Sequence, residues 1–185
     1  MQRGVCPWWL GHLLASPIRK LFQDPTRILA PHVREGMTVL EPGPGMGFFT
    51  LELARRVGPG GRVVAVDVEE RMLSGLLRRA RRAGVADRID ARLASGGALG
   101  IGDLAGQVDL VVAFAMIHEL PDVGAFFAEV WRSLAPGGKV LVAEPSGHVS
   151  AAGFEATLGA AERAGLRRQP GPAIALSRTA VLSAG

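Results

Sequence analysis

The sequence predicts an α/β fold with a doubly wound, mostly parallel sheet in a single domain, and three observations support this prediction. Residues 39–72 read as strand, glycine turn, helix and strand, which is one βαβ unit. Val108–Phe114 is apolar apart from Asp109, as expected of a strand covered on both faces. A chain of 185 residues that is 48 % apolar can bury one substantial core and is too short for two.

The segment before the first strand is predicted to be helical. Residues 8–22 carry apolar side chains at helical spacing, and Pro17 interrupts them, so two short helical pieces are expected. Asp24 and Pro25 supply the N-cap and the first residue of a further short helix. An amphipathic helix that packs on the sheet is one interpretation of this segment.

The glycine turn of the βαβ unit indicates a ligand site. Gly43, Gly45 and Gly47 permit positive φ in a tight turn and leave the backbone open to a ligand. Asp67 follows Gly47 by 20 residues, at the tip of the second strand, where its carboxylate can accept both hydrogen bonds from a ribose diol. The unit therefore predicts an adenosine ligand.

The same turn departs from the dinucleotide pattern G-x-G-x-x-G. In the two possible registers the third glycine would fall at Phe48 or Thr50. Glu41, just before the glycines, would repel a pyrophosphate but suits a ligand that carries an ammonium and a sulfonium. These residues disfavour NAD and FAD, and a nicotinamide oxidoreductase stays as a weaker alternative.

The later elements follow in alternation. An amphipathic helix after Asp67 ends near Gly84, and a third strand is expected at residues 88–93. Asp122 caps a helix after the fourth strand, and Pro-Gly-Gly at 136–138 turns the chain into a fifth strand at 139–144. The tail reads as a helix at about 150–164, a short segment at 166–169 and a strand at 173–182, whose apolar face includes Ile174, Leu176, Ala180 and Leu182.

The acid and glycines at positions 41, 43, 45 and 47 resemble the first motif of the class I S-adenosylmethionine (SAM)-dependent methyltransferases, an acid followed by G-x-G-x-G. The likeness is greatest to small enzymes of the quinone-biosynthesis (UbiE-like) type, with a methyltransferase type 11 or 31 domain. This resemblance implies a Rossmann-like seven-stranded sheet that ends in a C-terminal antiparallel hairpin. It also implies that residues 1–34 form a lid or cap segment on a methyltransferase domain at 35–185.

The resemblance further implies how SAM is held. The glycine turn binds the methionyl part, Asp67 binds the ribose hydroxyls, and Val68 and Met72 flank the adenine. The related enzymes often place an acid after the third strand, where this chain has Ala94 and Ser95, so Ser95 or backbone groups are expected to replace it. The expected cofactor-binding residues are Glu41, Gly43, Gly45, Met46, Gly47, Asp67, Val68, Met72, Ala94, Ser95 and Phe114.

Candidate catalytic residues follow the fourth and fifth strands. Methyl transfer from a sulfonium is a direct displacement, so a base is needed only when the acceptor holds a proton of high pKa. His118 is the first candidate, and Glu144 and His148 are the second. Each also fits a structural role, as a cap, a packed ring or a loop residue. With Glu119 these residues lack a short metal-ligand spacing, so no metal site is predicted.

Composition restricts the partners and the compartment. The pI of 10.5 reflects only four net positive charges, and the cluster Arg78, Arg79, Arg81 and Arg82 reads as a solvated helix end rather than an RNA patch. The single cysteine, Cys6, excludes an internal disulfide. No apolar run reaches the roughly 18 residues of a membrane span, and a cytoplasmic location is expected.

The sequence therefore predicts a SAM-dependent methyltransferase that acts on a small-molecule acceptor. The alternatives are a SAM-binding partner or regulatory domain without catalysis and, less favoured, a nucleic-acid methyltransferase. The identity of the acceptor and the oligomeric state stay open.

Overall fold

The structure is a computed structural model that describes residues 23–95 and 97–184. The helical pieces predicted before Gln23 lie outside the described residues. The chain divides into two compact units, Met1–Ala94 and Ser95–Gly185.

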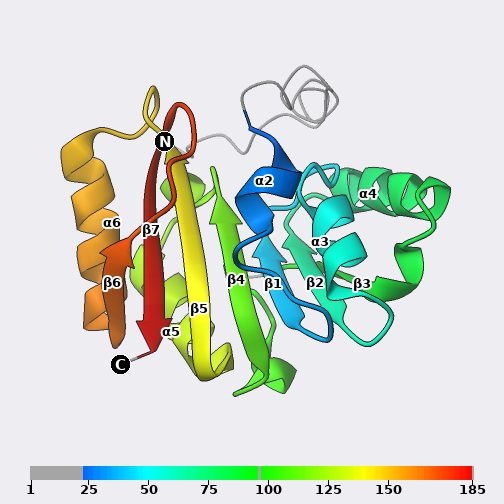
Figure 1. The fold of residues 1–185 in the computed structure, drawn as a ribbon. Coiled ribbons are helices and arrows are strands. Elements are labelled where there is room, and N and C mark those ends of the chain that lie inside the picture. The colour runs from blue at the N-terminus through cyan, green and yellow to red at the C-terminus, as the bar shows by residue number, and fades with distance from the viewer. Residues whose placement is uncertain (1–22, 96, 185) are drawn as a thin grey trace. The chain divides into compact units, whose positions relative to one another are not determined.

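The first unit is built on three parallel strands in the order β3-β2-β1. Its strands are β1 (Thr38–Pro42), β2 (Arg62–Asp67) and β3 (Ile89–Leu93). Its helices are α2 (Pro25–Leu29), α3 (Thr50–Val57), α4 (Glu70–Arg82) and the short 3-10 helix η2 (Ala86–Arg88). The chain therefore alternates strand and helix through this unit, as the sequence predicts (Figure 1).

Apolar spacing decides which face of α4 is buried. Leu73 and Leu76, three positions apart, form a core cluster with Ala65 of β2. The side chain of Glu69 caps the helix by accepting a hydrogen bond from the Arg71 N–H at 3.1 Å, and Gly84 ends it with a φ of 68°. α4 packs against β2 and β3. It begins at Glu70, three positions after Asp67.

The second unit has four strands in the order β4-β5-β7-β6. The strands are β4 (Val108–Phe114), β5 (Leu134–Pro145), β6 (Leu166–Pro170) and β7 (Ser177–Ala184). The helices are α5 (Val123–Ser133), α6 (Ala151–Arg163) and the 3-10 helices η3 (Gly102–Leu104) and η4 (Ile117–Glu119). β4 and β5 are parallel, whereas β7 is antiparallel to β5 and β6, so the expected C-terminal hairpin is present (Figure 1).

The starts of two strands differ from the prediction by four or five residues. β5 begins at Leu134, before the Pro-Gly-Gly segment, because Leu134 already pairs with Val108; the pairing then shifts and resumes with Lys139 opposite Leu110. β7 begins at Ser177 rather than at residue 173. Leu176 has a φ of 58° and is 75 % exposed, so its predicted place on the apolar face of the strand is wrong. The register shift in β5 and the left-handed conformation of Leu176 leave the spacing of apolar residues unchanged, so the sequence pattern does not reveal them.

Candidate active site

Glu41 is a buried acid at the end of β1. Its side chain is 4 % exposed, and its Oε2 atom has no hydrogen bond partner among the described residues. Burial raises the pKa of Glu41 from 4.5 to about 8; the nearby Thr50 hydroxyl offsets part of this shift, and the charge of Asp67 adds to it. Because one oxygen has no partner, Glu41 can still bind a ligand group, and a cationic group would favour its ionised form.

The glycines of the turn have different tasks. Gly43, Gly45 and Gly47 all have positive φ, between 55° and 82°. A Cβ on Gly47 would overlap Leu76 Cδ1, so this glycine allows α4 to pack closely under the turn. A Cβ on Gly45 would meet nothing within 4 Å, so this glycine leaves space beside bare backbone. Of these two glycines, only Gly45 leaves the space that a ligand-binding turn needs.

Asp67 is joined directly to the turn. Its Oδ2 accepts a hydrogen bond from the Gly45 N–H at 3.2 Å, and its Oδ1 accepts one from the Glu69 N–H at 3.0 Å. Burial raises the pKa of Asp67, and the backbone N–H groups of Glu69, Gly45 and Val68 counter this effect. The structure thus brings together the acid at the tip of β2 and the open glycine, which are 22 positions apart in sequence.

Arg79 contacts the glycine turn, which the sequence did not predict. Its guanidinium donates a hydrogen bond to the Met46 carbonyl in the turn, and burial lowers its pKa. The prediction that the arginine cluster lies on the solvated side is therefore wrong for this member. Beside it, Met46 is buried and lies where a Cβ on Gly75 would touch its Cγ at 3.1 Å. Together these contacts fix the turn from the α4 side.

The remaining residues expected to bind the cofactor differ in exposure and in hydrogen bonding. Val68 is 61 % exposed directly after Asp67, whereas Met72 is buried in the first turn of α4. The Ala94 N–H donates to the Asp67 carbonyl at 2.8 Å, and Ser95 pairs with Ala98 in an isolated bridge. In the second unit Phe114 ends β4 opposite Ala143.

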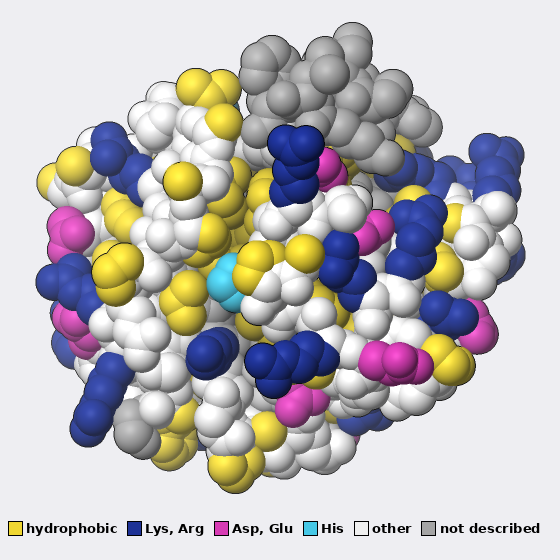
Figure 2. Space-filling view, in the orientation of Figure 1, with side chains coloured by type: hydrophobic (Ala, Val, Ile, Leu, Met, Phe, Trp, Pro, Cys, Tyr) yellow, Lys and Arg dark blue, Asp and Glu magenta, His cyan; other side chains and the backbone are white. Residues whose placement is uncertain are grey.

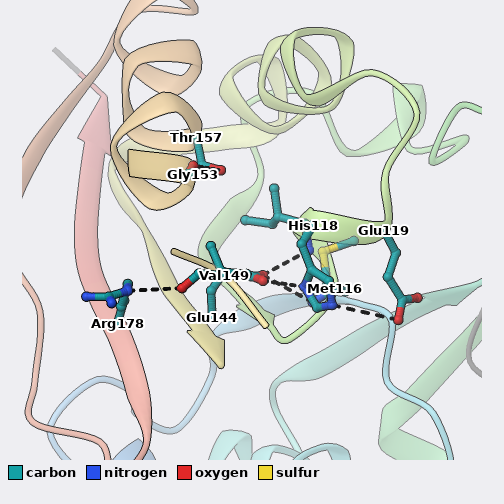
Figure 3. Close-up of polar contacts among 9 residues, drawn as sticks. Met116, His118, Glu119, Glu144, Val149, Gly153, Thr157 and Arg178 are labelled. Atoms are coloured by element: carbon teal, nitrogen blue, oxygen red, sulfur yellow. Dashed lines mark hydrogen bonds and ion pairs between the residues drawn. The ribbon is translucent and has the colours of Figure 1, made fainter. Parts of the chain in front are cut away.

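Glu144 and His118 form a hydrogen-bonded pair in the second unit (Figure 3). Glu144 lies near the end of β5, and its side chain is only 1 % exposed. Its Oε2 bonds to the Nδ1 atom of His118, and its Oε1 accepts from the N–H groups of Met116 and Ile117 at 3.2 and 2.9 Å. One buried carboxylate therefore fixes both the start of η4 and the ring that η4 carries.

His148 lies beside this pair. Its ring centroid is 6.2 Å from that of His118, and the two rings are nearly perpendicular. The structure thus gathers all three predicted catalytic residues in one unit. Glu119 Oε1 lies 4.0 Å from His118 Nε2, which is too long for a hydrogen bond.

Ala115 connects β4 to this cluster in a strained conformation. It is one of two described non-glycine residues with positive φ, at 55°, a conformation that costs roughly 1–2 kcal/mol. Its N–H donates to the Ala143 carbonyl at 2.8 Å, and the two following N–H groups then reach Glu144. Strain held in place by surrounding contacts is common at functional sites. No sequence signal marks an alanine for this role.

Among residues 23–95 and 97–184, no three His, Cys, Asp or Glu side chains are grouped so that they could hold a metal ion. Over the same residues, every helix is too short or too polar to cross a membrane.

The first unit contains an open glycine turn hydrogen-bonded to an acid, and the second contains a histidine bonded to a buried carboxylate; both features are expected of an α/β nucleoside-binding enzyme. Residues 40–142, more than half of the chain, match the family model described as "Methyltransferase domain". The chain belongs to this family.

Relatives of assigned function resemble the chain over part of their length. It is 32 % identical over 135 residues to "Ubiquinone/menaquinone biosynthesis C-methyltransferase UbiE" of Pasteurella multocida, covering 73 % of this chain and 49 % of that protein. It is 31 % identical over 109 residues to "Arsenite methyltransferase" of Halobacterium salinarum, covering 59 % of this chain and 27 % of that protein. The chain thus spans about half of the first relative and about a quarter of the second.

Two solved structures share this fold at low sequence identity. A SAM-dependent methyltransferase from Aquifex aeolicus superposes with a TM-score of 0.84 at 24 % identity, covering 97 % of this chain and 98 % of that one. A structure from Methanococcus maripaludis gives a TM-score of 0.76 at 17 % identity. The predicted fold class and the class I SAM-dependent methyltransferase class are confirmed.

Proposed function

We propose that this protein transfers a methyl group from SAM to a small-molecule acceptor by direct displacement. One observation carries the proposal: the glycine turn has open space at Gly45, its Gly45 N–H donates to Asp67, and a buried acid with one unpartnered oxygen, Glu41, ends the strand that leads into it. A sulfonium nucleoside has a positive charge for Glu41 and a ribose diol for Asp67, and it has no pyrophosphate that these acids would repel.

Each part of the first unit then has a task. Glu41 balances the positive charge of the cofactor, the Gly45 and Met46 backbone lies against its methionyl part, and Asp67 accepts hydrogen bonds from the ribose. Arg79 keeps the turn in shape through the Met46 carbonyl. Val68, Met72, Ala94, Ser95 and Phe114 remain proposed contacts of the cofactor. When bound, SAM supplies an electrophilic methyl group.

The second unit supplies the proposed catalytic residues. His118, held by Glu144, is placed to orient an acceptor or to receive its proton, and His148 supports it from the side. This arrangement favours an enzyme over a SAM-binding regulatory domain, because a domain that only binds SAM has no use for an oriented histidine.

The acceptor is proposed to be a small molecule, as the name of the UbiE relative suggests for that protein. On the face shown in Figure 2, Lys and Arg side chains of the described residues are scattered and form no continuous patch. This face therefore lacks the continuous basic surface that typically contacts a nucleic acid. A cytoplasmic location is proposed because a small-molecule methyltransferase needs a supply of SAM.

Calorimetry with SAM and with NAD tests the proposal. Binding of SAM at micromolar concentration, with no heat from NAD, is expected. S-adenosylhomocysteine, which lacks the methyl group and the sulfonium charge, should bind to the same site. Binding of NAD in the absence of any heat from SAM would refute the methyltransferase proposal.

Asp67→Ala is expected to weaken SAM binding by about 1.5–3 kcal/mol, because the variant loses hydrogen bonds to a charged group. Calorimetry measures the change. Glu70→Gln is a suitable control, since Glu70 is an exposed acid three positions further along the chain. Equal affinities of Asp67→Ala and the unchanged protein would show that the ribose does not contact Asp67.

A further inference from the structure

We infer that His118 acts as a general base positioned by Glu144, and that the acceptor therefore belongs to the hydroxyl compounds, such as phenols and enols, whose O–H proton must leave. This inference rests on the proposed methyltransferase function and narrows its substrate class. It starts from the hydrogen bonds of Glu144.

The pattern of these bonds sets the tautomer of His118. The two carboxylate oxygens of Glu144 face three nitrogen atoms, two of them backbone N–H groups of Met116 and Ile117. A carboxylate only accepts hydrogen bonds, so the third nitrogen, His118 Nδ1, carries the ring proton. In a neutral ring the other nitrogen, Nε2, then holds a lone pair that can accept a proton.

The position of the ring keeps this nitrogen usable. The side chain of His118 is 26 % exposed, whereas that of Glu144 is 1 % exposed, so the carboxylate is hidden and the ring is reachable. Glu119 does not approach Nε2 within hydrogen-bond distance. A partly exposed histidine with Nδ1 bonded to a buried carboxylate, and with Nε2 beyond hydrogen-bond distance of Glu119, has the arrangement of a positioned base.

The step balances without a further reactant. The acceptor oxygen forms a bond to the methyl carbon, and the carbon–sulfur bond of the cofactor breaks with its electron pair left on sulfur. The hydroxyl proton passes to His118 Nε2, and Glu144 stabilises the charge that the ring gains. The products are a methyl ether, S-adenosylhomocysteine and a protonated His118, which returns its proton to water.

Acceptors of other chemical classes gain less from a positioned general base. A neutral amine already offers a lone pair, and a thiol, with an ordinary pKa near 8.5, ionises far more readily than a phenol, with one near 10. Soft metals and metalloids favour several thiolate ligands, whereas the sequence contains one cysteine. Hydroxyl compounds are thus the class for which an oriented base gains most, about 10²–10⁴-fold in rate.

Glu144→Gln tests the positioning role. Its amide oxygen can still accept from Met116 and Ile117, but its NH₂ group then faces Nδ1 and forces the proton of His118 onto Nε2. Nitrogen NMR of the histidine rings is expected to show Nδ1–H in the unchanged protein and Nε2–H in the variant. A proton on Nε2 in the unchanged protein, or no change of tautomer in the variant, would overturn the inference. Glu155→Gln, an exposed acid of the same unit, is the control.

Transfer to phenol, aniline and thiophenol, probes with a common ring, tests the acceptor class. Phenol-type acceptors, extended to catechol and hydroquinone, should be methylated, and His118→Ala should lower that rate about 100-fold or more while SAM affinity stays unchanged. Added imidazole should restore part of the rate, which a purely structural role would not allow. Transfer only to aniline, thiophenol or arsenite, no transfer to any hydroxyl probe, or no rescue would refute the inference. Failure to bind SAM would instead refute the proposed function.

Discussion

Gly45→Val is expected to abolish SAM binding while the fold is kept. The Cβ position of Gly45 points into open space, so the valine side chain would occupy the volume that the proposed ligand needs. We expect affinity to fall about 100-fold or more, equivalent to about 2.8 kcal/mol, as measured by calorimetry. Backbone strain at a φ of 55° costs roughly 1–2 kcal/mol, which a domain with 5–15 kcal/mol of stability tolerates.

Gly84→Val is the matched control for this experiment. Gly84 also has positive φ, 68°, and a Cβ there also meets nothing within 4 Å, but the residue lies beyond the end of α4 and outside the glycine turn. The control should lose a similar amount of stability and keep its SAM affinity. If both variants bind SAM equally well, the ligand does not lie against Gly45. If Gly45→Val alone unfolds, the glycine is structural.

Glu41→Gln is expected to remove a large pH dependence of stability. The folded chain keeps the Glu41 proton up to a pKa of about 8, whereas the unfolded chain releases it near the ordinary value of 4.5. The stability that this group contributes is complete below pH 4.5 and is lost as the pH rises to about 8, by roughly 1.4 kcal/mol for each pH unit. Urea unfolding at pH 5.5, 6.5 and 7.5 measures this slope.

The variant replaces the acid by a neutral group of the same shape, so its stability should vary less over that range and exceed that of the unchanged protein at pH 7.5. Burial also raises the pKa of Asp67, but this residue is the same in both proteins, so the comparison isolates Glu41. Glu70→Gln, which changes an exposed acid, should leave the slope as it is. Equal slopes in all three proteins would show that Glu41 is ionised in the fold.

The sequence is sufficient to predict most elements because local signals agree with one another. The bounds of β4 are as predicted, and β2 ends at Asp67 as the glycine-to-acid spacing requires. The predicted caps Asp24 and Asp122 each accept the expected hydrogen bond. Each of these signals depends on neighbours within a few positions.

The sequence misses features that depend on contacts between distant segments. Gly45 and Gly47 look alike in sequence, but Leu76 of α4 makes one of them structural and leaves the other open. Arg79 belongs to a solvated-looking cluster, although it bonds to the turn 33 positions earlier. Leu176 fits an alternating strand pattern yet lies outside β7.

The amino-acid sequence by itself predicted the class of this protein, through the resemblance of its acid and three glycines to the methyltransferase motif. It also predicted an adenosine ligand, because Asp67 follows the glycine turn at the spacing typical of a ribose-binding acid. Only the tertiary structure decided that Glu144 is buried against His118, 26 positions earlier in the chain. Residue spacing in the sequence does not reveal which ring nitrogen of a histidine forms a hydrogen bond in the folded protein. The hydrogen bonding of His118 depends on the position of Glu144 on a separate strand, β5. The proposed class of acceptor depends in turn on this hydrogen bonding.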